Sequence, residues 1–167
     1  MALAVELAEE QLSVRATHRL INGLPGDFDL EAALSRDFEV LAIDPPDATV
    51  GIRMEEAGAL ALLTANGTWL LIPRAGSSPS SDPEDVDSMR LEPVLAKLPS
   101  HEVTYQHGWD LAAAAVAKGA AQAAILLKPP TVSQIAETGR GGKRMPPKTT
   151  YFWPKPRTGL VFREVGG

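Results

Sequence analysis

The sequence contains no cysteine, and this absence excludes disulfide bonds, thiolate catalysis and every metal site that uses cysteine ligands. It also suits a reducing compartment. The three histidines are scattered, without the His-x-His or His-Glu-x-x-His spacing that indicates a zinc site. No Gly-x-Ser-x-Gly segment is present, so the nucleophile of an α/β-hydrolase is not supported. None of these motifs therefore assigns the sequence to an enzyme class.

Long apolar runs are also missing, since none approaches the ~20 residues that cross a bilayer. The opening MALAVELAEE is acidic, whereas a secretory signal begins with basic residues. We therefore expect a cytoplasmic protein that neither enters nor spans a membrane. An apolar fraction of 44% in 167 residues supplies a core for one ordinary domain. The net charge of −5 disfavours a generic nucleic-acid binder.

Charge is distributed unevenly along the chain. Acidic residues dominate the Ser- and Pro-rich stretch 77–92, whereas the segment 140–163 contains no acid. Its basic residues are Arg140, Lys143, Arg144, Lys148, Lys155, Arg157 and Arg163. Such a run is typical of a solvated face and equally of a surface that binds anions. The charge pattern leaves both interpretations open.

Local pattern predicts an α+β fold with a small mixed sheet. Asn66-Gly67, between the apolar segments 59–64 and 68–72, is typical of a β-hairpin, and the strands have the composition of strands buried on both faces. The Ser-, Pro- and Asp-rich segment 75–87 predicts an exposed loop or a hinge. It would separate an N-terminal lobe, residues 1–74, from a C-terminal lobe, residues 88–167.

The C-terminal lobe has a more regular pattern. A short strand at 102–105, an alanine-rich helix at 111–118 and a buried strand at 123–127 predict a βαβ-like unit. Asp110 is the expected cap of the first helix. Thr131 and Gln134 have the spacing of a capping box at the start of the next helix.

The first candidate site lies in the basic C-terminal segment. Pro146, Pro147, Pro154 and Pro156 each fix φ, so Lys148 and Lys155 should project in defined directions beside the Thr149 hydroxyl. Lysine charges, a hydroxyl and glycine backbone suit a phosphate or carboxylate ligand. The glycine spacing is not that of a P-loop. The alternative is a stiff arm whose aromatic residues 151–153 pack on the body.

Two further candidate sites lie on opposite sides of the predicted hinge, one before it and one after it. Arg15, His18 and Arg19 could clamp a phosphate between two guanidinium groups and an imidazole, or could be ordinary surface residues. Tyr105 and His107 stand between a strand and a helix, where polar side chains either face a ligand or satisfy the loop backbone. The residues alone do not decide between these alternatives.

Four segments resemble one known family. MPPKTTYFWPKPRTGLVF closely resembles the C-terminal signature of the bacterial and archaeal family called domain of unknown function 1015, and the segments ATHRL, HEVTYQHG and AAILLKPPTVSQIAETGRGGKRMPPK resemble it too. Members are usually much longer. Their N-terminal half carries a Gly-His-His-Arg-type motif similar to that of the ParB and sulfiredoxin superfamily, which includes a free-serine kinase.

This sequence has no Gly-His-His-Arg motif and resembles only the C-terminal half of the family. The resemblance therefore implies an incomplete piece of a larger fold, in which Lys148, Thr149 and Lys155 join Arg15, His18 and Arg19 in neutralising a ligand. The expected ligand is a phosphorylated small molecule or a nucleotide with magnesium, and the chain alone is not expected to be catalytic.

The alternative is a ParB-like module that binds nucleic acid or regulates without catalysis, which the overall acidity disfavours. An exposed strand edge also predicts a homo-oligomer or pairing with a missing N-terminal half.

Overall fold

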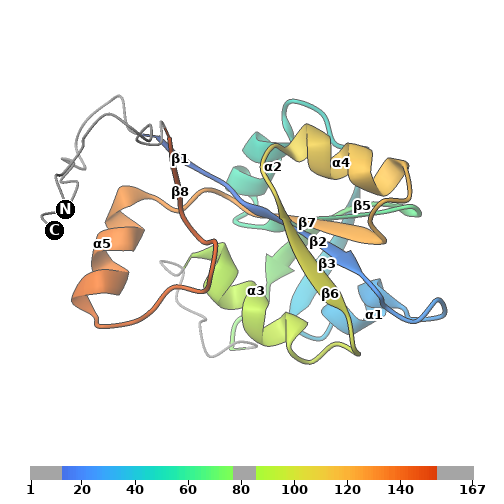
Figure 1. The fold of residues 1–167 in the computed structure, drawn as a ribbon, viewed down its shortest axis with the longest axis horizontal. Helices are drawn as coiled ribbons and strands as arrows, with labels where there is room; N and C mark the ends of the chain where they lie inside the picture. Colours follow the sequence, from blue (N-terminus) through green and yellow to red (C-terminus); the bar gives the residue numbers. More distant parts are fainter. Residues whose placement is uncertain (1–12, 77–85, 154–167) are drawn as a thin grey trace, which may run out of the picture.

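The computed structural model describes residues 13–76 and 86–153. A central six-stranded sheet carries helices on both faces, and a separate two-stranded ribbon lies beyond one end of it (Figure 1). The predicted α+β class is confirmed. Among the described residues, no helix has the length and apolar character needed to cross a membrane.

The six-stranded sheet has the order β3-β5-β4-β7-β2-β6, and each neighbouring pair is antiparallel. Its strands are β2 (His18–Asn22), β3 (Phe38–Ile43), β4 (Leu60–Thr64), β5 (Gly67–Pro73), β6 (Glu102–Gln106) and β7 (Ala123–Leu126). The sheet was expected to be mixed, and in the described residues its ladders are antiparallel throughout.

The predicted hairpin forms from β4 and β5 with a shifted turn. Thr64 pairs with Gly67, so the two-residue loop is Ala65-Asn66 instead of Asn66-Gly67. The Asn66 N–H donates to the Thr64 hydroxyl over 3.1 Å, which stabilises this register locally. Gly67 has φ 158° and opens β5 within the ladder.

The βαβ-like unit is present in split form. β6, the helix α4 (Trp109–Ala117) and β7 follow one another, and β2 lies between the two strands, antiparallel to both. α4 begins after Gly108, whose φ is 84°, and Asp110 lies in its first turn instead of capping it. The strand β2 therefore completes a unit whose other elements, β6, α4 and β7, come much later in the chain.

Strands from both sides of the segment predicted as a hinge alternate in the six-stranded sheet. β7, from the segment after the hinge, lies between β4 and β2, which both precede it. Segments 13–74 and 88–153 therefore share one sheet, because strand pairing joins residues far apart in the chain.

The central strands β4 and β7 are buried on both faces of the sheet, which explains their near-continuous apolar sequences. Leu60 and Leu62 of β4 pack toward α1 (Leu30–Leu34) and α3 (Asp87–Leu95). Ala61 and Leu63 pack toward α2 (Val50–Glu56) and α4. Successive side chains of a strand point to opposite faces, so β2, β4, β5 and β7 each contribute to both cores. The expectation that the hairpin strands are buried on both faces is confirmed for β4.

Beyond the sheet, β1 (Ser13–Arg15) pairs antiparallel with β8 (Tyr151–Trp153), with Arg15 opposite Tyr151. α5 (Val132–Arg140) lies near this ribbon (Figure 1). The predicted capping box of Thr131 and Gln134 opens α5. The ribbon brings the basic C-terminal segment next to the first strands of the chain.

We expect Leu62→Ala, which removes a fully buried side chain of β4, to lower the free energy of unfolding by about 3 kcal/mol through lost burial and a cavity. Leu41→Ala, on the edge strand β3 with a side chain 50% exposed, should change it by less than about 0.5 kcal/mol. Urea denaturation measures both. Equal losses would contradict the burial of Leu62 in the core.

Candidate functional site

A cavity of about 620 Å³ opens at one end of the sheet, on the face covered by α2 and α4. It lies where β2 begins and where β6 and β7 end, because His18 pairs with Gln106 and Arg19 pairs with Ile125. Its volume falls in the range of small-molecule sites. Its polar and charged lining residues include Arg15, His18, Glu55, His107 and Lys128.

The remaining wall of the cavity is largely apolar. Val50, Ile52 and Met54 come from α2, Trp109 opens α4, and Leu126 ends β7. Apolar walls with a few convergent polar groups are typical of sites for small ligands, since the walls supply burial and the polar groups supply orientation.

His18 is buried, with 6% of its surface exposed. Its Nδ1 accepts the Leu127 N–H over 3.3 Å, so in the neutral ring the hydrogen resides on Nε2. Burial lowers the pKa of His18 to about 4, the charges of His107 and Arg19 act in the same direction, and Asp110 opposes them. His18 therefore brings a neutral N–H donor to the cavity near pH 7. From the sequence, this residue was expected to help neutralise an anionic ligand.

Arg15 reaches the cavity from β1. Its guanidinium carbon lies 4.5 Å from the ring centroid of Trp153 in the paired strand β8. Stacking occupies one face of the guanidinium group, and its N–H donors lie in its plane. Arg15 is thus a charged group held in place by the ribbon.

His107 links the same ribbon to the sheet. Its ring centroid lies 4.0 Å from that of Tyr151, and its Nδ1 lies 3.3 Å from the Ala16 carbonyl oxygen and 3.5 Å from the Thr17 hydroxyl. Tyr151 therefore packs on His107 next to the sheet, and Trp153 packs on Arg15 within the ribbon. Through these contacts the ribbon stands beside the cavity.

Lys128 is a cavity residue that the sequence did not single out. It follows β7, and its side chain is 19% exposed. The Lys128 Nζ lies 3.6 Å from Oδ1 of the buried Asp87. Burial raises the pKa of the Asp87 carboxyl, whereas Lys128 and Arg90 act in the opposite direction. The sequence feature that could have identified Lys128 is its position just after a strand that is buried on both faces.

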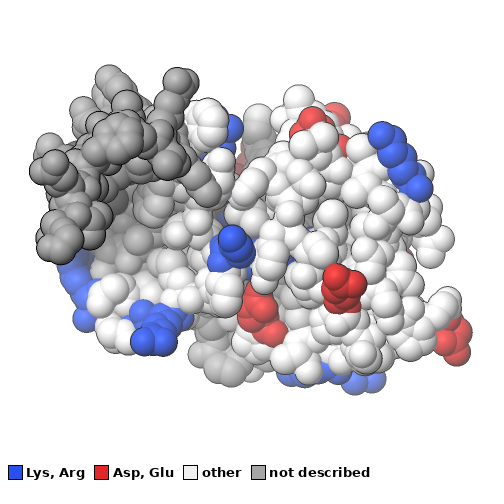
Figure 2. All heavy atoms as spheres, in the orientation of Figure 1, with Lys and Arg blue, Asp and Glu red and all other residues white. Residues whose placement is uncertain are grey.

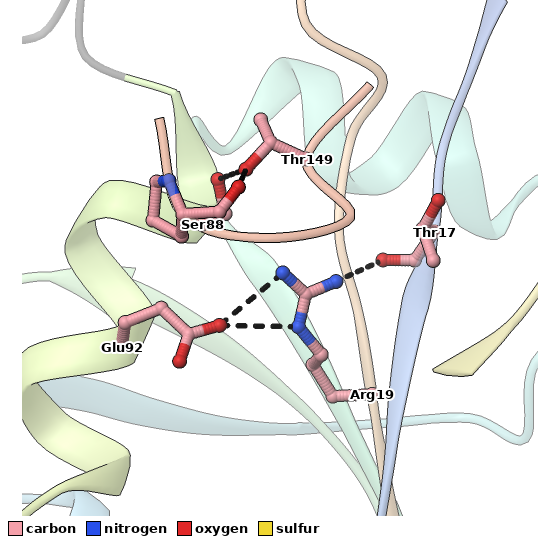
Figure 3. A network of polar contacts seen from close by, with 6 residues as sticks. Thr17, Arg19, Ser88, Glu92 and Thr149 are labelled. Carbon is pink, nitrogen blue, oxygen red and sulfur yellow. Dashed lines mark hydrogen bonds and ion pairs between the residues drawn. The ribbon is translucent and has the colours of Figure 1, made fainter. Parts of the chain in front are cut away.

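Arg19 belongs to a different group on the α3 side (Figure 3). Its side chain is completely buried. Nε and Nη2 donate to one carboxylate oxygen of Glu92 over 3.3 and 3.2 Å, and Nη1 donates to the Thr17 carbonyl over 2.8 Å. The Tyr105 ring covers the guanidinium at 4.9 Å. Arg19 and Tyr105 thus join β2, β6 and α3 and do not line the 620 Å³ cavity.

Thr149 is also a structural link. Its hydroxyl donates to the Pro146 carbonyl over 2.7 Å and lies 2.8 Å from the Ser88 hydroxyl, which can donate to it (Figure 3). These contacts fasten the C-terminal segment to the start of α3. The role of Thr149 in holding a ligand stays a prediction, and this residue does not line the 620 Å³ cavity.

Lys148 is exposed and does not line the 620 Å³ cavity. Its φ of 59° follows Pro147 in a turn, a conformation in which glycine is the usual residue. Lys155 lies outside the described residues. The structure therefore brings together Arg15, His18 and His107 with Lys128, and places Lys148 apart from them.

The exposed basic residues Arg140, Lys143, Arg144 and Lys148 lie at the end of α5 and after it. Figure 2 shows basic side chains at the end of the molecule that carries α5. Arg140 pairs with Glu137 one turn earlier in the helix. This surface is solvated and is distinct from the cavity.

Magnesium was the metal ion expected to accompany a nucleotide. Among residues 13–76 and 86–153, no three His, Asp or Glu side chains gather closely enough to hold a metal ion.

Solved structures share this fold. A mutant free serine kinase in complex with AMP has a TM-score of 0.60 and 18% identity, and the match covers 89% of this chain and 56% of that one. A mutant of the kinase with ADP gives 0.60 and 18%, covering 90% and 58%. A conserved hypothetical protein from Pyrococcus furiosus gives 0.58 and 19%, covering 89% and 59%.

At these identities the likeness establishes the fold alone. The chain spans between 56% and 59% of the length of these structures. No family model matches the chain, and neither does any curated protein.

The buried neutral His18 should make stability depend on pH. Its pKa is about 4 in the folded protein against 6.5 ordinarily, so unfolding takes up a proton between these values. The contribution of His18 is complete above pH 6.5 and is lost as the pH falls toward 4, by up to about 3 kcal/mol. We expect His18→Asn, which can still accept the Leu127 N–H, to flatten urea-midpoint curves across this window. An unchanged pH dependence would contradict the assignment.

Lys148 should be replaceable by glycine with a gain in stability. Lys148→Gly relieves the positive φ, and we expect it to raise the free energy of unfolding by about 0.5–1 kcal/mol after the entropic cost of glycine. Lys148→Ala keeps the unfavourable backbone and should bring no such gain. Thermal and urea unfolding compare the variants. A gain with alanine as large as with glycine would show that the backbone is not the cause.

Proposed function

We propose that the chain is the nucleotide-binding half of a protein related to small-molecule kinases, and that its 620 Å³ cavity holds the phosphate groups. The observation that carries this proposal is the convergence of Arg15, His107 and Lys128 on one cavity with an apolar wall. The fold shared with free serine kinase structures in complex with AMP and ADP supports it.

The cavity residues have distinct chemical roles in this proposal. Arg15 offers N–H donors in a plane that matches phosphate oxygens, and Lys128 offers a point charge. His18 adds a ring N–H donor from the beginning of β2. The apolar side chains of Ile52 and Trp109, on the same cavity wall, suit the uncharged part of the ligand. Such fixed donors stabilise negative charge without reorganising.

The same proposal assigns the remaining catalytic groups to a segment outside this chain. The share of the kinase structures that the chain spans, 56% to 58%, supports this division of roles. We also propose that the chain belongs to the family called domain of unknown function 1015, on the strength of segments such as MPPKTTYFWPKPRTGLVF and HEVTYQHG. Catalysis would then require the other half, either in the same protein or in a partner.

The proposal is tested by measuring ADP binding with isothermal titration calorimetry. Arg15→Met removes the charge and keeps a long side chain against Trp153, so we expect the Kd for ADP to rise about tenfold, which corresponds to ~1.4 kcal/mol. The matched control is Lys118→Met, which removes an equal charge from an exposed residue at the other end of α4. It should leave the Kd unchanged.

A short DNA duplex in the same titrations separates the ParB-like alternative. Nucleic-acid binding at the exposed basic surface would weaken steeply with salt and would not depend on Arg15. DNA binding without ADP binding would overturn the proposed function, and so would equal effects of the Arg15 and Lys118 variants.

A further inference from the structure

Lys128 lies just after the end of β7, where it lines a cavity on each face of the sheet. It lines the 620 Å³ cavity on the side of α2 and α4. It also lines a small cavity on the α3 side, together with Thr17, Arg19, Asp87 and Thr149. Lys128 therefore connects the proposed ligand site with the buried charges on the opposite side.

Asp87 holds Lys128 by two contacts of different kinds. Its Oδ2 accepts the Lys128 backbone N–H over 2.8 Å, which fixes the chain where it leaves β7. Its Oδ1 lies 3.6 Å from the Lys128 Nζ, too far for a hydrogen bond. The side chain of Asp87 is only 4% exposed. The backbone contact is thus a firm link, whereas the ammonium group is held mainly by the attraction between the two charges.

The charge of Asp87 depends on this neighbour. Burial raises the pKa of the Asp87 carboxyl, and Lys128 and Arg90 counteract that effect. A second charged pair beside α3 consists of Arg19 and Glu92, which are hydrogen-bonded to each other. A ligand that draws the Lys128 ammonium away would leave Arg90 as the cation that favours the ionised form of Asp87.

We propose that Asp87 is the internal counter-anion of Lys128 and that an anionic ligand in the cavity competes with it for the ammonium group. The proposal rests on the function proposed above. Asp87 then acts through Lys128 as a positioning residue, without touching the ligand. It holds the cation ready at the cavity and lowers its affinity for phosphate. When the ligand engages Lys128, the buried carboxylate loses a stabilising charge and takes up a proton from solvent.

Asp87→Asn tests this competition. The amide oxygen that the substitution introduces can still accept the Lys128 N–H, so the link to β7 is kept while the negative charge is removed. We expect the Kd for ADP to fall about tenfold, because the ammonium no longer has an internal competitor. In the background of Lys128→Met, the same substitution should have no effect on the Kd, since the two residues act as one unit.

Glu92→Gln is the matched control. It removes the same charge from the same helix, but its partner Arg19 does not line the 620 Å³ cavity. We expect the Kd for ADP to stay within about twofold of the wild-type value. Melting temperatures of all variants show whether each one is folded.

Proton uptake supplies a second readout that a purely structural role of Asp87 would not change. ADP titrations at pH 6 in buffers of different ionisation enthalpy measure the protons bound with the ligand. The wild-type protein should take up more protons than Asp87→Asn. If Asp87→Asn does not fold, the comparison between wild type and Lys128→Met decides, and equal uptake overturns the proposal.

The outcomes separate this inference from the proposed function. A wild-type protein that does not bind ADP overturns both. ADP binding that weakens with Arg15→Met but does not tighten with Asp87→Asn overturns the role of Asp87 alone. Equal tightening with Glu92→Gln would show a general charge effect and would likewise overturn it.

Discussion

The pairing of β2 with both β6 and β7 is the constraint on which the rest of the structure depends. These pairings join His18 to Gln106 and Arg19 to Ile125, across most of the described chain. They place the beginning of β2 beside the ends of β6 and β7. Without them, Arg15 and His18 would not share a cavity with His107 and Lys128.

Buried charge reinforces this arrangement from the α3 side. Arg19, the second residue of β2, is satisfied by Glu92 of α3 and by the Thr17 carbonyl. Asp87, at the start of the same helix, holds the chain as it leaves β7. A buried charge without a partner is costly, so each pair restrains where α3 lies relative to the strand ends. Sheet pairing and ion pairing therefore support the same geometry.

The elements that the sequence could predict are those with local causes. The hairpin and the capping box of Thr131 and Gln134 depend on neighbouring residues, and both form. The turn of the hairpin was displaced by one residue because the Thr64 hydroxyl and the ladder register favour Ala65-Asn66. The order of strands in the sheet could not be predicted, because it depends on pairing between residues far apart in the chain.

The candidate site was predictable in part for the same reason. Arg15, His18 and His107 were singled out by type and position, yet their proximity arises from the β2–β6 pairing and from the contact of the β1–β8 ribbon with His107. The neutral state of His18 depends on burial, and burial is a property of the folded protein. Lys128 has no motif of its own, since its importance comes from the strand end that it occupies. Lys148 carried the sequence argument and lies outside the cavity lining.

The most direct test of the central claim is an ADP titration followed by amide NMR shifts. The account predicts that the largest shifts cluster at the strand ends around the cavity, at Gly108, Trp109, Leu127 and Lys128, which line it together. Shifts confined to the exposed basic residues 140–148, or no shifts at saturating ADP, would contradict it.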